Sequence, residues 1–273
     1  MGKEHFYKNR SLDFAELRYS RGSRASFKPH MHRLFSIGAV EEGAVRYTVG
    51  GEAAVLRPGS LLLVNPEILH TCNPGDESGR SYYMLHLDLD WCCRVQQAVW
   101  AVEAFAPVGQ TRIDDRPLYD VFCRTAAGLT AEDIHLQEKE QMLFDLAFRV
   151  FSAACSAPHG TGRAETDSDR DIRSLKKLLS EDLHRDFTIH SLAEDSDINP
   201  YRLIRSFKAA TGITPHAYRM NCRIERAREL LRAGEEIAET ALACGFFDQS
   251  HFHRYFKAMT TVTPRAYRVN FLQ

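Results

Sequence analysis

Two groups of basic and polar side chains, 49 positions apart, are the residues with the clearest capacity for chemistry. Each group is interleaved with an apolar pair at i and i+4 spacing, which predicts an amphipathic helix with one buried face. The apolar pairs are Leu203 with Phe207 and Phe252 with Phe256. The side chains left on the free faces are Tyr201, Arg202, Ile204, Arg205 and Lys208 in the first copy, and Gln249, Ser250, His253, Arg254 and Lys257 in the second. A capped helix with a polar, basic free face after a tight turn fits the major groove of DNA, so each copy predicts a helix–turn–helix.

The elements that must position these side chains are marked by capping and turn residues. Asn199-Pro200 in the first copy and Asp248 in the second are expected N-caps that start the two helices. Gly245 makes the turn in the second copy, and Asp197 occupies that place in the first. Aspartate tolerates the left-handed backbone conformation better than most residues, so we expect both turns to form.

A stiff connector is predicted between the two copies. Thr214-Pro215 is a further N-cap and N1 pair, and no Gly or Pro follows it as far as Arg232. A helix of this length spans about 28 Å at its usual rise. Adjacent major-groove faces of B-DNA recur about every 34 Å, so the connector can hold two reading helices near that spacing.

These residues resemble the two-motif DNA-binding domain of the AraC/XylS family of bacterial transcription regulators, over residues 170–271. The strongest match runs from Ile237 to Lys257 and closes on Thr263 to Arg268. The resemblance implies base-reading positions beside the buried residues of each second helix. These positions are Tyr201, Ile204 and Arg205 in the first copy, and Gln249, Ser250, His253 and Arg254 in the second. Ile204 is apolar where the family often has a polar reader, so its partner would be a thymine methyl group or nothing.

Composition and charge agree with a soluble protein of two domains that binds a polyanion. The chain has 273 residues, of which 44% are hydrophobic and 26% charged, with a net charge of −1. Residues 198–232 carry 8 Lys and Arg against 2 Asp and Glu, which is the footprint expected for phosphate contact. The chain has no apolar run of membrane-spanning length and no signal-peptide core, and its 7 cysteines include no Cys-x-x-Cys. We therefore expect a cytoplasmic protein without a disulfide framework.

The segment from about Leu12 to Leu89 predicts a β-rich domain. Period-two or apolar runs, separated by turn signals, favour a barrel or a double-sheet roll. The runs are Leu34–Val40, Ala44–Val49, Ala53–Leu56, Leu61–Val64 and Tyr82–Leu89. The pattern resembles the cupin-type effector domain that the AraC/XylS family carries upstream, through Lys28-Pro29-His30-Met31-His32, Glu42-Gly43, Arg57-Pro58-Gly59 and Asn65-Pro66 followed by His70. The expected fold is α+β: an N-terminal cupin-like β-barrel with flanking helices, and a C-terminal all-α domain.

By resemblance, a small effector binds inside the barrel. The inward-facing candidates are Lys28, His30, His32, His70, Cys72, Tyr83 and Leu85. A register shifted by one residue would instead direct Tyr82 and His86 inward. Lysine with several histidines would suit an anionic or hydroxylated effector.

Other readings of the same residues remain open. His30, His32 and His70 suit a metal site in a metal-dependent cupin enzyme or sensor. However, no Glu follows His32 at the short interval of enzymatic cupins, so we expect no metal, no cofactor and no catalytic residue. Cys92-Cys93 would suit a redox sensor, but buried cysteines are commonly structural. A protein–protein adaptor is a further alternative, and it leaves the basic concentration without a purpose.

The predicted domains are residues 1–155, a flexible linker at 156–169, and residues 170–273. After Leu89 the pattern becomes helical, and the longest stripe runs from about Asp133 to Ala154. In the family one such helix commonly makes a dimer contact, although plain packing on the barrel explains the stripe nearly as well. The expected partners are promoter DNA, a small effector, a second copy of the chain and RNA polymerase. Activation and repression are compatible with the same sequence.

Overall fold

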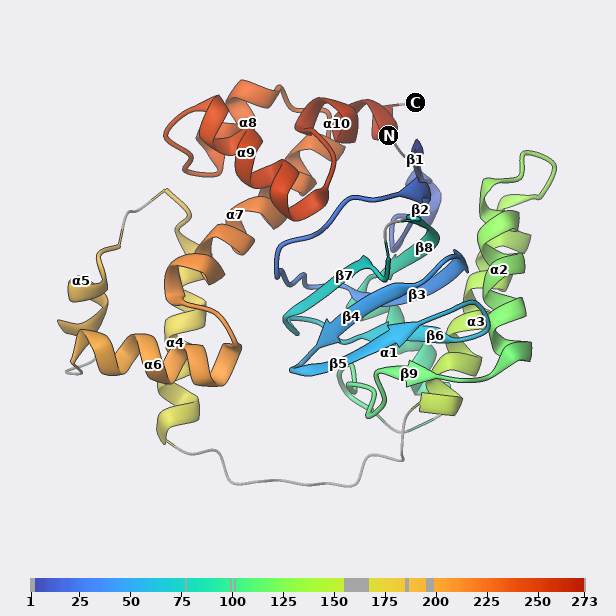
Figure 1. Cartoon of the computed structure of the whole chain (residues 1–273), viewed down its shortest axis with the longest axis horizontal. Helices are drawn as coiled ribbons and strands as arrows, with labels where there is room; N and C mark the ends of the chain where they lie inside the picture. Colours follow the sequence, from blue (N-terminus) through green and yellow to red (C-terminus); the bar gives the residue numbers. More distant parts are fainter. Residues whose placement is uncertain are drawn as a thin grey trace. The chain divides into compact units, whose positions relative to one another are not determined.

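The computed structural model describes residues 3–76, 78–98, 100, 102–154, 167–184, 187–194 and 199–272. Two compact units are present (Figure 1): Met1–Ser26 with Met31–His159, and Phe27–His30 with Gly160–Gln273. Most of the predicted linker at 156–169 lies outside the described residues, and a helix begins at Asp167 within its last part. In the described part of the chain, no helix combines the length and apolarity that crossing a membrane requires.

The N-terminal unit contains two antiparallel sheets. Its strands are β1 (Lys3–Lys8), β2 (Ala15–Ser23), β3 (Phe35–Glu42), β4 (Val45–Val49), β5 (Glu52–Leu56), β6 (Leu61–Val64), β7 (His70–Pro74), β8 (Arg80–Leu87) and β9 (Arg112–Ile113), with a short 3₁₀ turn at Arg10–Leu12. The larger sheet has the order β1-β2-β8-β3-β6-β9, and the smaller one has the order β5-β4-β7. Within the described residues, strand pairing stays inside each sheet, so the expected barrel is not closed. The unit is a double-sheet roll.

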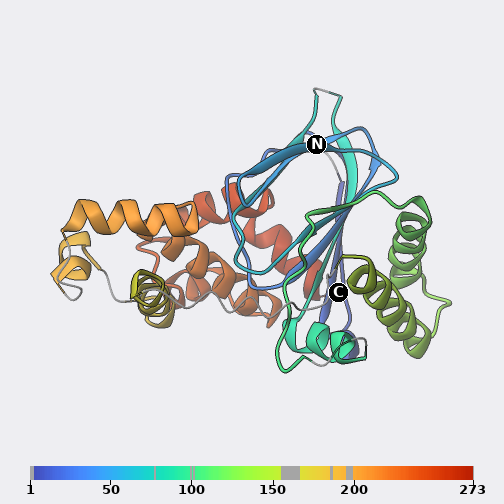
Figure 2. The same cartoon turned by 90° about the horizontal axis from the view of Figure 1, so that it is seen from below.

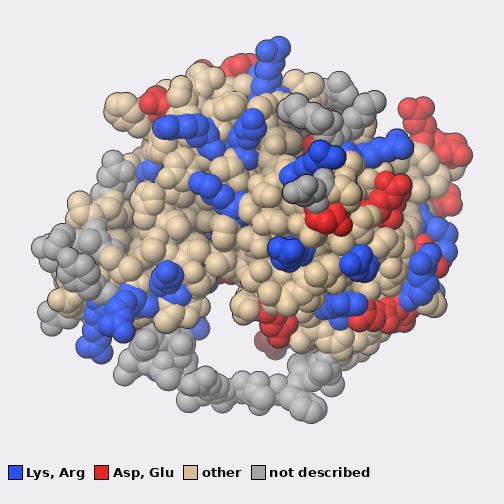
Figure 3. All heavy atoms as spheres, viewed as in Figure 1, with Lys and Arg blue, Asp and Glu red and all other residues tan. Residues whose placement is uncertain are grey.

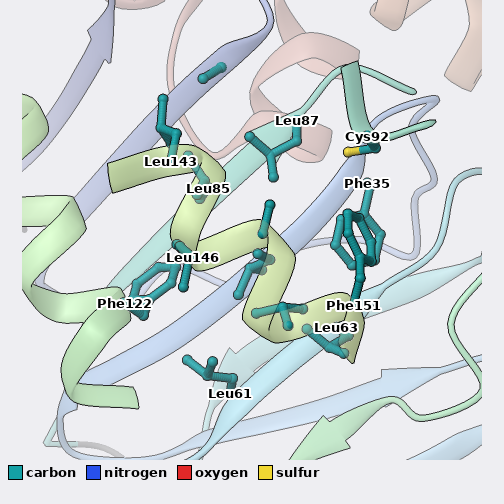
Figure 4. Close-up of a cluster of buried hydrophobic side chains, with 14 of the residues drawn as sticks. Phe35, Leu61, Leu63, Leu85, Leu87, Cys92, Phe122, Leu143, Leu146 and Phe151 are labelled. Atoms are coloured by element: carbon teal, nitrogen blue, oxygen red, sulfur yellow. The ribbon is translucent and has the colours of Figure 1, made fainter. Parts of the chain in front are cut away.

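Three helices cover the outer face of the larger sheet. They are α1 (Leu89–Gln97), α2 (Arg116–Thr130) and α3 (Leu136–Ala154), and Figure 2 shows α2 and α3 side by side along that face. Asp88 and Asp115 cap α1 and α2 by accepting hydrogen bonds from backbone N–H groups of the first turn. The apolar stripe of α3 includes Leu146 and Phe151, which are fully buried against the sheet (Figure 4). Burial of each such side chain stabilises the fold by about 1.5–3 kcal/mol.

The C-terminal unit is helical and duplicated. Its helices are α4 (Asp167–Glu181), α5 (Ile189–Glu194), α6 (Pro200–Thr211), α7 (Pro215–Arg232), α8 (Ile237–Ala243), α9 (Gln249–Thr260) and α10 (Pro264–Leu272). The 18 residues of α7 span about 27 Å. In Figure 1, α4 to α6 lie at one end of α7 and α8 to α10 at the other. The helical connector predicted between two copies is therefore present.

The two copies repeat individual contacts as well as helices. The rings of Phe207 and Tyr218 lie 5.5 Å apart in the first copy, and those of Phe256 and Tyr267 lie 5.4 Å apart in the second. These paired rings attach α6 to α7 in the first copy and α9 to α10 in the second. The duplication seen in the sequence is thus a duplication of packing.

Candidate nucleic-acid interface and effector site

The second recognition helix, α9, presents a polar face on a fully buried apolar base. The Asp248 carboxylate accepts a hydrogen bond from the His251 backbone N–H at 2.6 Å and starts the helix. Phe252 and Phe256 are completely buried, which orients the helix. The predicted site residues of this copy are all exposed, namely Gln249, Ser250, His253, Arg254 and Lys257. This arrangement can donate hydrogen bonds to base edges and phosphates.

The first recognition helix, α6, has the same construction. Leu203 and Phe207 are buried beneath it. Of the predicted site residues, Arg202, Arg205 and Lys208 are exposed and Ile204 is partly buried. The side chain of Tyr201 lies outside the described residues, as do the turn residues Asp197 and Ile198. In Figure 3, Lys and Arg side chains gather over α6 without Asp or Glu among them on that face.

The turn before α9 requires glycine for two separate reasons. Gly245 has a φ of +73°, which is the left-handed region that favours glycine. A Cβ atom at this position would also collide with the backbone carbonyl oxygen of Leu183 and lie 2.9 Å from Nη2 of Arg223. The turn of the second copy is therefore packed directly against the segment that follows α4.

Much of the basic charge counted in residues 198–232 lies inside the domain. Arg219, Arg223 and Arg228 on α7 are each at least nine-tenths buried. Arg223 donates from Nε and Nη2 to the Leu183 carbonyl oxygen at 3.0 and 2.8 Å. Arg228 donates to the Tyr267 hydroxyl oxygen at 3.2 Å and forms an ion pair with Glu225. These three arginines interact with groups inside the domain, so the charge count over residues 198–232 overstated the charge that is exposed for phosphate contact.

Three buried histidines meet between the two sheets of the N-terminal unit. The ring of His32 lies 4.7 Å from that of His70 and 5.0 Å from that of His86. The Nδ1 atoms of His32 and His70 face the carbonyl oxygens of Leu34 and Ile68 at 2.9 and 2.8 Å. Because a carbonyl oxygen only accepts, Nδ1 carries the proton in both rings.

Burial keeps at least one of these rings neutral. Desolvation lowers the pKa of His70 from 6.5 to about 4, although its hydrogen bond to the Ile68 carbonyl acts in the opposite direction. At neutral pH its Nε2 is therefore a hydrogen-bond acceptor. Within the described residues, no group of three or more His, Cys, Asp or Glu is arranged to hold a metal ion.

Two of the predicted effector residues lie elsewhere. The His30 ring stacks on Phe27 at 5.4 Å, and its Nδ1 lies 2.8 Å from the Lys28 carbonyl oxygen. The Lys28 side chain is exposed, and both residues group with the C-terminal unit. The structure thus brings together His32 and His70 but not Lys28 and His30.

The inward orientation predicted for Tyr83 and Leu85 is wrong. Leu85 belongs to the core between the larger sheet and the helices, where Figure 4 shows it close to Leu143 and Leu146. Tyr83 packs against the same core and donates a hydrogen bond to Glu41 at 3.2 Å. Since successive side chains of a strand alternate between faces, Tyr82, Met84 and His86 are directed toward the smaller sheet. The register shifted by one residue is the correct one.

Cys72, predicted to face the effector, and Cys92, considered as part of a redox sensor, are both buried. Cys72 belongs to the apolar cluster between the sheets, and desolvation raises the pKa of its thiol to about 12. Cys92 is completely buried in the helix-side core, where burial also raises its pKa. Both thiols stay protonated at neutral pH, which argues against thiolate chemistry or redox sensing at these positions.

On the inter-sheet face of β8, Arg80 was not among the predicted site residues, and Tyr82 was predicted to face inward only in the shifted register. Arg80 is 1% exposed and donates to the backbone carbonyl oxygens of Ser23, Ala25 and Cys72. Its guanidinium lies 4.9 Å from the centre of the Tyr82 ring. Arg80 Nε and the Tyr82 hydroxyl are buried and have no hydrogen-bond partner among the residues that the structure describes. Buried polar atoms of this kind are uncommon and mark a place where a ligand can supply the missing partner. The alternation Arg80, Tyr82, Met84, His86 in the sequence was the signal for them.

Comparison with known proteins assigns both units. The AraC-like ligand binding domain family matches residues 14–147, and the helix-turn-helix domain family matches residues 192–270. The HTH-type transcriptional activator RhaS of Salmonella paratyphi B is 31% identical over 239 residues, covering 84% of this chain and 83% of that protein. The HTH-type transcriptional regulator YbfI of Bacillus subtilis is 25% identical over 231 residues, covering 85% and 83%.

Solved structures show the same fold. Crystal structures of ToxT from Vibrio cholerae align with a TM-score of 0.58 at 14% identity, covering 99% of this chain and 98% of ToxT. Another ToxT structure, with an unsaturated fatty acid bound, aligns with a TM-score of 0.58 at 15% identity, covering 98% and 94%. At these identities the similarity concerns the fold alone.

Proposed function

The chain belongs to the AraC/XylS family of transcription regulators, and we propose that it reads a promoter through the exposed faces of α6 and α9 under the control of a small molecule held between its two sheets. Its N-terminal unit is a ligand-binding domain and its C-terminal unit a DNA-binding domain of this family. The observation that carries the proposal is the polar face of α9. Five polar or basic side chains are exposed there above two completely buried phenylalanines. We infer that the chain acts as a regulator without catalysis, in the cytoplasm where its DNA target lies.

Arg205 and Arg254 are proposed as direct readers of bases. Each is exposed and sits two residues after the first buried side chain of its recognition helix. A guanidinium that donates two hydrogen bonds to a guanine distinguishes it from other bases by about 1–3 kcal/mol. Arg202, Lys208 and Lys257 are proposed to contact phosphates, which would position the helices without selecting sequence.

A binding selection tests these roles. The full-length protein is used to select duplexes from a random pool, and the affinity of variants is then measured on the selected duplex and its point-mutated forms. Arg205→Ala and Arg254→Ala are each expected to lose about 1–3 kcal/mol and to relax preference at one base position. Arg57→Ala removes one exposed charge from the N-terminal unit and serves as the charge-matched control. Unchanged base preference in both helix variants would reject the assignment.

The effector is proposed to bind between the two sheets, beside the Tyr82 hydroxyl and Arg80 Nε, on the face of β8 that also carries His86. The Tyr82 hydroxyl and Arg80 Nε can donate hydrogen bonds, which suits a ligand that carries carboxylate or hydroxyl oxygens. ToxT, which shares the fold, has been solved with an unsaturated fatty acid. This supports a small-molecule effector without identifying the one used here.

Two neighbouring tyrosines provide a matched test of the effector site. A panel of small carboxylates and polyols is screened by thermal shift on the wild type, Tyr82→Phe and Tyr83→Phe. Removal of the unpaired Tyr82 hydroxyl costs no existing hydrogen bond, so the variant is expected to fold normally. The ligand-induced shift should fall in Tyr82→Phe and persist in Tyr83→Phe, whose ring lies on the helix-covered face. Equal responses in the two variants would reject this site.

Association of two chains is proposed through α3, and contact with RNA polymerase through the DNA-bound C-terminal unit. Phe148 on α3 is 37% exposed and stacks on Phe144 at 6.2 Å, which leaves an apolar strip on the outer side of the helix. Sedimentation of the wild type and of Phe148→Glu tests the dimer. A monomeric wild type would reject it.

A further inference from the structure

Phe247 is the most exposed large hydrophobic side chain of the described residues, at 91%. Its neighbour Phe246 is 3% exposed and packs on Phe252, with the two ring centres 5.1 Å apart. The chain therefore buries one phenylalanine and extends the next into solvent. A single exposed apolar residue is ordinary on a protein surface, but an almost fully exposed aromatic ring leaves a large unfavourable contact with water.

The position of Phe247 is defined on both sides. Gly245 is confined by the Leu183 carbonyl group, and Phe246 is anchored in the core. Asp248, immediately after Phe247, caps α9 through its hydrogen bond to the His251 N–H. Because its neighbours on both sides are held, the Phe247 ring is presented at the N-terminal end of α9, next to the exposed Gln249 and Ser250.

This end of a recognition helix is the part that contacts base edges when the helix lies in the major groove. The apolar feature that the major groove offers is the C5-methyl group of thymine. We propose that Phe247 is a specificity-determining residue that packs against a thymine methyl group at the edge of the site read by α9. The proposal rests on the assignment of α9 as a DNA-reading helix.

A protein partner would need a larger apolar surface than this region provides. Leu242 and Val269 are the other large hydrophobics of the C-terminal unit that the structure shows exposed, at 63% and 48%. A specific protein interface buries about 800 Å² on each partner, whereas one aromatic side chain supplies about 150–250 Å². One ring is sufficient for a thymine methyl group. Continuity with the polar face of α9 therefore favours DNA as the occupant.

Replacement of thymine by deoxyuridine removes only the methyl group and tests the contact directly. The full-length wild type is used to select a duplex from a random pool, and each thymine of that duplex is then replaced singly by deoxyuridine. For the wild type, one replacement is expected to weaken binding about fourfold, the effect of one buried methyl group. Phe247→Ala should bind the selected duplex more weakly and should respond equally to thymine and deoxyuridine at that position. Phe247→Leu should retain part of the discrimination.

Two controls separate the failure of this inference from that of the proposed function. Leu242→Ala removes a second exposed apolar side chain outside the recognition helix and should keep the wild-type response to deoxyuridine. Far-UV circular dichroism verifies that the variants fold, as expected for truncation of exposed side chains. One outcome would refute the Phe247 contact while DNA reading by α9 stands. In that outcome Arg254→Ala relaxes base preference, but Phe247→Ala keeps the wild-type affinity or still binds more weakly when the same thymine is replaced by deoxyuridine. If Arg254→Ala also keeps full preference, DNA reading by α9 fails, and the Phe247 contact fails with it.

Discussion

Gly245→Ala is expected to destabilise the DNA-binding domain far more than an ordinary glycine substitution. The new methyl group would occupy a left-handed residue, which costs about 1 kcal/mol by itself. It would also displace the Leu183 carbonyl group, which accepts two hydrogen bonds from the buried guanidinium of Arg223. Hydrogen bonds to charged groups contribute about 1.5–3 kcal/mol each. With partial relaxation, we expect a total loss of about 3–5 kcal/mol.

The protein offers separate signals for its two units. Both tryptophans, Trp91 and Trp100, belong to the N-terminal unit, so tryptophan fluorescence follows the unfolding of that unit. Far-UV circular dichroism follows the loss of helix, and α4 to α10 all lie in the C-terminal unit. Urea unfolding of Gly245→Ala should shift the helical transition to lower denaturant and leave the fluorescence transition in place.

Gly51→Ala is the control for backbone strain. Gly51 has a φ of +93°, but a Cβ atom there would meet nothing within 4 Å. The free energy of unfolding of Gly51→Ala should therefore fall only by the strain contribution of about 1 kcal/mol. This loss should appear in the fluorescence transition, which follows the N-terminal unit. A loss below about 1 kcal/mol in Gly245→Ala, no larger than in Gly51→Ala, would refute the packing of the turn against Leu183 and Arg223.

Two further predictions concern stability. Because the folded protein keeps His70 neutral with a pKa of about 4 while the unfolded chain protonates it near 6.5, stability should be complete above about pH 7 and should fall as the pH drops from 6.5 toward 4. In urea unfolding followed by tryptophan fluorescence, the free energy of unfolding should fall by about 2 kcal/mol between pH 7.5 and pH 5. The variant His70→Leu should lack this pH dependence. If the variant keeps the wild-type dependence, the assignment to His70 is wrong. Thr261, a β-branched residue with a φ of 65°, stands where the first copy has Gly212 with a φ of 81°. Thr261→Gly should therefore raise the free energy of unfolding by about 1 kcal/mol, and Gly212→Thr should lower it. Both changes are measured by urea unfolding followed by circular dichroism. If Thr261→Gly is less stable than the wild type, the strain argument fails.

The helical half was predictable from the sequence because its signals are local. N-caps, turn residues and the 3.6-residue period act within a few positions, and the duplication doubled each signal. Asp248 and Thr214 cap the helices as expected, with side-chain oxygens that accept backbone N–H groups at 2.6 and 3.2 Å. Even the threonines that end the recognition helices repeat, since Thr211 and Thr260 each donate to a carbonyl oxygen four residues earlier at 2.7 Å.

The count of basic residues over 198–232 overestimated the exposed charge, because formal charge carries no information about exposure. Arg219, Arg223 and Arg228 have helical spacing that is compatible with an exposed basic stripe. In the folded unit they reach backbone carbonyl oxygens, aromatic rings and Glu225 instead. Guanidinium groups can be buried when their donors and charge are satisfied in this way. That satisfaction depends on tertiary neighbours, which periodicity does not reveal.

The register of β8 could not be predicted because both of its faces are covered. A strand with one solvent face alternates between apolar and polar residues, whereas the stretch from Tyr82 to Leu87 is largely apolar throughout. Helices cover the Leu85 side and the smaller sheet lies opposite the Tyr82 side. The edge strand Lys3–Lys8 was not predicted either, because it mixes charged and aromatic residues without a clear two-residue period. Closure of the sheets is likewise a long-range property, and the expected barrel proved to be two sheets.

Footprinting of the selected duplex tests the central claim most directly. If α6 and α9 read DNA from the two ends of α7, methylation interference should reveal two contacted major-groove segments about one helical turn apart, near 34 Å. Arg205→Ala should weaken the contact in one segment and Arg254→Ala in the other. A single contacted segment, or two variants that affect the same segment, would contradict the two-helix account.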